Sequence, residues 1–167
     1  MRPLSSNSVD LTVFVIANSF NLLVSVLFLA RMRGNHRAER TAGLMAVALG
    51  PPLGACATLS LTAGRPWWMS VFPLLLAAHC AFELVLDYVL HVDWRVGPLK
   101  APALILYYVG QMAMIGYSFG ALKGLGFVTL ATYLLSLVVS WYTLRAGDAH
   151  PQPTRGKEAW SRWPSHS

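Results

Sequence analysis

The sequence predicts an all-α membrane protein, a polytopic bundle of five transmembrane helices. Of its 167 residues, 55% are hydrophobic and only 12% are charged, whereas an ordinary soluble domain has roughly 25% charged residues. The apolar residues also form long blocks instead of alternating with polar ones, which is the pattern of burial in a bilayer. We therefore expect one compact membrane domain.

Five apolar segments follow one another along the chain. At about 1.5 Å of rise per residue, a helix of about twenty residues covers a hydrocarbon core of roughly 30 Å. The connections between the segments are short, so neighbouring helices should pack antiparallel. The predicted spans are residues 11–30, 42–63, 67–91, 101–119 and 124–144.

The second predicted span contains a Gly-Pro-Pro-x-Gly segment at its middle, residues 50–54. Pro51 and Pro52 have no N–H to donate to the preceding turn, which leaves the carbonyls of Val47 and Ala48 without helical partners. The sequence therefore predicts a broken helix, with Pro51 and Pro52 as a hinge and two free acceptors near mid-membrane.

The chain divides into a membrane domain, residues 1–145, and a polar, proline-containing tail, residues 146–167. The tail has too few aliphatic residues to bury a core, so we expect a disordered, basic, cytoplasmic segment. The chain shows no internal repeat, which counts against the inverted-repeat transporter folds.

Lysine and arginine are unevenly divided between the two sides of the predicted bundle. Because cytoplasmic loops carry the excess, the amino terminus is expected outside and the carboxyl terminus in the cytoplasm. A re-entrant second segment would remove this bias, so five spans are favoured. The expected inner side holds Arg31, Arg33, Arg37, Arg40, Arg95, Lys100, Arg145, Arg155, Lys157 and Arg162, and the outer side Arg2, Arg65 and Lys123.

The basic residues lie between and after apolar blocks and do not form one continuous face, so nucleic acid is not an expected partner. We expect the lipid bilayer to surround the helices and anionic headgroups to lie beside the cytoplasmic loops. The expected location is a bacterial or archaeal plasma membrane.

The third predicted span is the only one that contains acidic residues. His79, Glu83, Asp87 and His91 recur every four residues, so in an α-helix they form a slanting stripe with an arc of roughly 120°. A charged carboxylate at mid-membrane costs about 2.5 to 3.5 kcal/mol, and no lysine or arginine lies within the spans to pair with it. Two carboxyl groups one turn apart must hold a proton or share a cation. The four residues are the candidate ion- or proton-binding site, and no cofactor is expected other than a cation that Glu83 and Asp87 could share.

Polar residues of other spans lie at a similar depth. Asn18 and Asn21 of the first span and Tyr107 and Gln111 of the fourth are expected to support the stripe as a polar interior pocket. A purely structural interpretation stands beside this one, because amides commonly bridge membrane helices and proline kinks are common. The GxxxG pattern at residues 116–120 predicts a close helix contact.

Three classes of function remain open. The sequence has no HExxH, GxSxG, CxxCH or phosphate-loop motif, so it does not indicate a conventional enzyme. A small transporter or permease component, in which the acidic site handles a proton, cation or small solute, is favoured. A lipid-modifying enzyme with a His/Glu/Asp site and a non-catalytic subunit are the alternatives. Five helices are few for a complete alternating-access machine, so we expect a homo-oligomer or a larger membrane complex.

Overall fold

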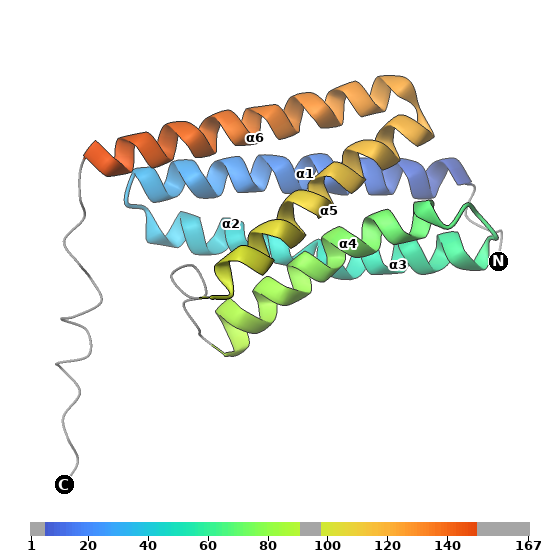
Figure 1. Ribbon diagram of the computed structural model, residues 1–167, viewed down its shortest axis with the longest axis horizontal. Helices are drawn as coiled ribbons and strands as arrows, with labels where there is room; N and C mark the ends of the chain where they lie inside the picture. Colours follow the sequence, from blue (N-terminus) through green and yellow to red (C-terminus); the bar gives the residue numbers. More distant parts are fainter. Residues whose placement is uncertain (1–5, 91–97, 150–167) are drawn as a thin grey trace, which may run out of the picture.

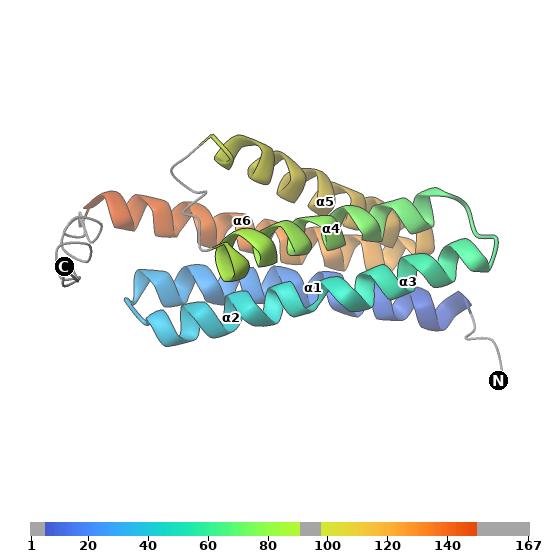
Figure 2. The same ribbon diagram turned by 90° about the horizontal axis from the view of Figure 1, so that it is seen from below.

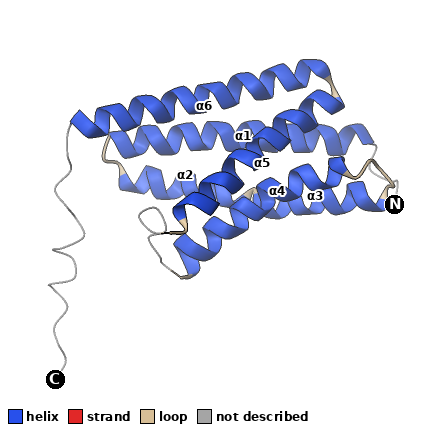
Figure 3. Ribbon diagram, in the orientation of Figure 1, coloured by secondary structure: helices blue, strands red, loops and turns tan. Residues whose placement is uncertain are grey.

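The computed structural model describes residues 6–90 and 98–149, and these residues form helices with no strand (Figure 3). Its elements are α1 (Ser6–Met32), α2 (His36–Ala48), α3 (Gly50–Thr62), α4 (Trp68–Glu83), the π-helix η1 (Leu84–Val89), α5 (Lys100–Ala121) and α6 (Lys123–Ala149). His91 and residues 150–167 of the predicted tail lie outside the described residues. The described part of α6 continues to Ala149, past the predicted domain boundary at residue 145.

Five helical stretches are long and apolar enough to cross a membrane, as the sequence predicts. They are Asn7–Met32, His36–Thr62, Trp68–Val89, Lys100–Ala121 and Lys123–Thr143. Each overlaps one predicted span, because uninterrupted apolar blocks of this length have few other ways to satisfy their backbone groups away from water.

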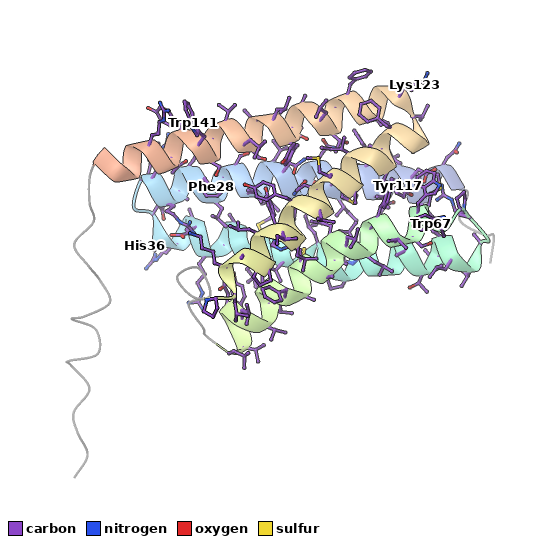
Figure 4. The ribbon with its side chains drawn as sticks, viewed as in Figure 1. Phe28, His36, Trp67, Tyr117, Lys123 and Trp141 are labelled. Carbon is purple, nitrogen blue, oxygen red and sulfur yellow. The ribbon has the colours of Figure 1, made fainter. Side chains whose placement is uncertain are left out.

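The helices form a ring in chain order (Figures 1 and 2). α1 packs against α2 and α6, α3 packs against α4, and α5 packs against both α4 and α6. The N-terminal end of the bundle comprises the start of α1, the α3–α4 loop and the α5–α6 turn. The opposite end comprises the α1–α2 turn and the end of α6. Tyr117 and Lys123 lie toward the N-terminal end with Trp67, whereas His36 and Trp141 lie toward the opposite end (Figure 4).

The second span is interrupted where the Gly-Pro-Pro-x-Gly segment predicts a break. α2 ends at Ala48 and α3 begins at Gly50, with Leu49 between them. The carbonyl of Ala46, one turn before the break, accepts from the Leu49 N–H at 3.2 Å and from the Cys80 thiol at 3.7 Å. A Cβ at Gly50 would come within 2.9 Å of the Cys80 Cβ, so the absence of a side chain at Gly50 permits close contact between α3 and α4.

Glycines also permit close packing of α5 against α4. Aromatic side chains of α4 pack against the two glycines of the GxxxG pattern. A Cβ at Gly116 would meet the ring of Phe72, and a Cβ at Gly120 would overlap the ring of Trp68. The predicted close helix contact is therefore an intramolecular contact between α4 and α5.

The third span departs from the regular α-helix that the sequence predicts. α4 ends at Glu83, and Leu84–Val89 continue as a π-helix, in which the Leu90 N–H donates to the Val85 carbonyl at 2.8 Å. A π-helix has a wider turn than an α-helix because its hydrogen bonds join residues i and i+5. The sequence predicts one uniform α-helical stripe from His79 to His91. This prediction is wrong for the four-residue step from Glu83 to Asp87, which does not have α-helical geometry.

Candidate functional site

His79 lies buried among three helices near the middle of its span. At about 1.5 Å per residue it is about 16 Å along a stretch of roughly 33 Å. Its ring makes edge contacts with Phe20 of α1, at a centroid distance of 6.2 Å, and with Tyr107 of α5, at 5.3 Å. These aromatic contacts fix the position of the imidazole at the point where α1, α4 and α5 meet.

Glu83 is the ionisable neighbour of His79. Its Oε1 lies 3.8 Å from the Nε2 of His79, one helical turn away, and its side chain is 23% exposed. This separation exceeds the 2.7 to 3.2 Å of an ordinary N–H···O hydrogen bond. The two groups are therefore close enough to interact electrostatically but are not held by a direct hydrogen bond.

The buried Nδ1 of His79 has no hydrogen-bond partner among the described residues. Leaving a buried polar atom unpaired costs about 1 to 3 kcal/mol. Such atoms are rare enough to need an explanation, and a bound cation or water molecule would supply one.

Asp87 belongs to η1 and is half-buried. Within the described residues, no three His, Cys, Asp or Glu side chains come close enough together to hold a metal ion. His79, Glu83 and Asp87 therefore do not form such a group, and the sharing of one cation by Glu83 and Asp87 stays a prediction. The structure brings together the first two members of the predicted stripe.

The predicted supporting residues divide into two sets. Tyr107 contacts His79, and Gln111, one turn further along α5, is buried with its Nε2 unpaired among the described residues. Asn18 and Asn21, in contrast, bond to α6. Their support of the stripe as part of one polar pocket stays a prediction.

The second set forms a hydrogen-bonded series that we term the α1–α6 seam: Asn18, Asn21, Ser118, Thr129 and Thr132. Asn21 Nδ2 donates to Thr132 Oγ1 at 3.1 Å, and that hydroxyl donates to Asn18 Oδ1 at 2.7 Å. Asn18 Nδ2 lies 3.3 Å from Thr129 Oγ1, which lies 3.0 Å from Ser118 Oγ of α5. Neutral interhelical bonds of this kind fasten membrane helices together.

A third polar cluster was missed by the sequence analysis. At the N-terminal end, Asp10 Oδ1 accepts from Arg65 Nη2 and from the Tyr117 hydroxyl, both at 2.6 Å. The Arg65 and Asp10 side chains are only 12% and 17% exposed, and Tyr117 is fully buried. A signal was present: Asp10 and Arg65 have opposite charges and flank predicted spans on the same side of the bundle.

The surroundings of Arg65 act on its pKa in opposite directions. Burial on its own lowers the pKa of the guanidinium, but the hydrogen bonds and charges of Asp10 and Tyr117 outweigh burial and raise it above its ordinary value. Arg65 is therefore a permanent cation, and the cluster is a buried ion pair that also binds a tyrosine.

Comparison with protein-family models, with curated proteins and with solved structures finds no match to this chain.

Proposed function

We propose that this chain is an integral membrane protein of five spans and a small transporter or permease component, in which His79 and Glu83 bind a proton or small cation during its passage. The observation that carries the proposal is the pairing of these two ionisable groups, 3.8 Å apart, halfway along an apolar span. Ionisable side chains at this depth are costly, and they commonly mark ion pathways and proton relays.

The chemistry of the pair suits reversible binding. A neutral imidazole and a carboxylate can each accept a proton, and a carboxylate can also bind a small cation. The unpaired Nδ1 of His79 provides a second position at which a proton can be taken up or released.

Irregular helix geometry surrounds the site. The π-helix η1 begins immediately after Glu83, and the α2–α3 break packs against Cys80, the neighbour of His79. Interrupted helices are typical of ion-binding sites in transporters, and π-helical segments frequently occur at functional sites. These features support the proposal, with Pro51 and Pro52 as the hinge.

Charge supports the proposed orientation, with the amino terminus outside. Among the described residues, the N-terminal end has Arg65, whose charge is balanced by Asp10, and Lys123. The opposite end has Arg31, Arg33, Arg37, Arg40, Lys100 and Arg145. This end would then face the cytoplasm and contact anionic headgroups, each basic residue contributing about 1 kcal/mol.

Because five spans are few for alternating access, we propose that the chain works as an oligomer.

The test is ion flux in proteoliposomes that contain the full-length protein and a pH-sensitive dye. A pH step or a cation gradient should produce flux with the wild type and little or none with Glu83→Gln, because the amide keeps the shape of the side chain but cannot ionise. Glu39→Gln is the matched control, since Glu39 lies at the bundle end and pairs with Arg31. Flux that is equal in Glu83→Gln and wild type would refute the site. Absence of flux in the wild type would contradict transport and favour the subunit alternative.

A further inference from the structure

Asp10, Arg65 and Tyr117, which we term the clamp, join three segments that are distant in the sequence. Asp10 belongs to α1, Arg65 to the α3–α4 loop and Tyr117 to α5, and a single carboxylate oxygen accepts from both partners. Tyr117 and Trp67 lie at the same end of the bundle in Figure 4. The clamp therefore holds the N-terminal end of three neighbouring elements together.

The opposite end of the bundle has an ion pair of a different kind. Arg31 and Glu39 lie 2.8 Å apart but belong to consecutive helices, and their side chains are 41% and 24% exposed. An exposed pair of this kind contributes little, typically 0 to about 1 kcal/mol. Of these two ion pairs, the one at the N-terminal end is buried and joins segments that are distant in the sequence.

Polar atoms without partners lie close to the clamp in the fold. Ser60 Oγ, Ser70 Oγ and Arg65 Nη1 are buried and make no hydrogen bond with the described residues. Ser60 and Ser70 lie two residues, about 3 Å, inside the facing ends of α3 and α4, which pack together. A cluster in which only some polar atoms are hydrogen-bonded stabilises the closed structure poorly, because each unpaired buried group is costly. Water entering from the N-terminal face would satisfy all three groups.

The buried side of α4 leads from this region to the proposed ion site. Ser70, Pro73, Leu76 and His79 are all buried residues of α4. Nine residues separate Ser70 from His79, which is about 14 Å along a helix. Between them Leu76 is fully buried, so the route is closed by apolar packing as well as by the clamp.

We propose that the clamp is a gate, and that its opening admits water and the transported proton or cation from the N-terminal face along the buried side of α4 to His79 and Glu83. This inference rests on the proposed function. In this structure the gate is closed: Asp10 Oδ1 accepts from both Arg65 and Tyr117, and Ser70 is buried.

The experiment measures access to Ser70. Ser70→Cys is introduced into the full-length protein with Cys56 and Cys80 replaced by alanine, and labelling by a charged maleimide is followed in nanodiscs, where the reagent reaches both faces. Asp10→Asn should accelerate labelling about tenfold or more, because the neutral amide loses the ion pair with Arg65. Tyr117→Phe should give a smaller increase, because it removes one hydrogen bond and keeps the ring that packs on Trp68.

Two controls separate opening of the gate from general loosening. Glu39→Gln breaks the ion pair at the opposite end and should leave the labelling rate of Ser70→Cys unchanged. A second reporter, Ala17→Cys, is buried in the core on α1 and should remain unlabelled in the Asp10→Asn protein. If Asp10→Asn does not fold, the comparison of Tyr117→Phe with the parent protein decides the question.

The gate is overturned if Ser70→Cys reacts rapidly with the clamp intact, or if the clamp variants leave its rate unchanged or expose Ala17→Cys equally. The failure of the proposed function is distinct, because it is measured as flux. Wild-type protein without flux would refute transport whatever the labelling shows. Normal flux together with a labelling rate of Ser70→Cys that the clamp variants do not change would refute only the gate. Glu83→Gln should abolish flux and leave the labelling of Ser70→Cys as in the parent protein.

Discussion

The α1–α6 seam and the His79–Glu83 pair are both buried polar regions inside apolar helices, but their hydrogen bonding differs. In the seam, the Thr132 hydroxyl both donates to Asn18 and accepts from Asn21, and none of the seam residues is charged at neutral pH. In the pair, two ionisable groups lie 3.8 Å apart. Each region keeps one buried atom unpaired among the described residues, Asn21 Oδ1 in the seam and His79 Nδ1 in the pair. The two regions therefore differ in charge and in bonding between helices: the seam residues join α1 to α6, whereas we propose that the pair binds an ion.

After Glu83→Gln, which should abolish flux, substitution of His79 is expected to have the largest effect on ion flux. His79→Gln keeps a polar group beside Glu83 but removes a side chain that can take up a proton, so flux should fall roughly tenfold to a hundredfold. The thermal stability of the protein should change much less than its flux. Proteoliposome flux and thermal unfolding of the same preparation measure both. Unchanged flux would place His79 with the structural residues of the seam.

Substitution of Asp87 is expected to reduce flux less than substitution of Glu83. Asp87 lies in η1 and does not complete a metal-binding group with His79 and Glu83, so Asp87→Asn should lower flux only several-fold, roughly a loss of 1 kcal/mol. Flux measured at several cation concentrations is the readout. A loss as complete as that of Glu83→Gln would restore the shared-cation site that the sequence predicts.

Substitution in the seam should lower stability more than flux, which is the reverse of the effect expected for His79. Asn18→Ala removes the bonds of the Asn18 side chain to Thr129 and Thr132, so it should destabilise the protein by about 1 to 2 kcal/mol while flux persists. Thermal unfolding in detergent measures the effect. Ser136→Ala is the matched control, because the Ser136 hydroxyl bonds to a carbonyl of its own helix, that of Tyr133. Loss of flux in Asn18→Ala without loss of stability would show that the seam belongs to the ion pathway.

Removal of the residues after Ala149 should have the smallest effect. The predicted tail has too few aliphatic residues to contribute to the bundle core. A truncated protein should insert, purify as the same species and conduct flux at the wild-type rate. Size-exclusion chromatography and flux provide the comparison. Loss of the folded species would show that the tail docks on the bundle.

Much of the fold was predictable because bilayer burial leaves a strong pattern in the sequence. The long apolar blocks define the five helical stretches, and the missing N–H groups of Pro51 and Pro52 predict the break before Gly50. The π-helix was not predictable, because the composition of Leu84–Val89, apolar apart from Asp87 and Tyr88, suits either helical form. The choice between them depends on packing against other helices.

The site was predicted in part for a similar reason. Periodicity placed His79 and Glu83 together, since one α-helical turn joins them, but depth along a helix does not determine the direction of a side chain around its axis. Asn18 and Asn21 have the expected depth and bond to α6. The clamp, in contrast, was within reach of sequence reasoning, because Asp10 and Arg65 are opposite charges at the same end of two spans.

The proposed site is tested most directly by whether Glu83 itself changes its protonation state when an ion arrives. Difference infrared spectroscopy of the reconstituted protein, with stepwise changes in pH and added cation, records the carboxyl bands. We expect a band that responds to pH or cation in the wild type and in Glu39→Gln and is missing in Glu83→Gln. Identical carboxyl responses in Glu83→Gln and the wild type would show that Glu83 neither binds the proton nor the cation, and would contradict the proposed site.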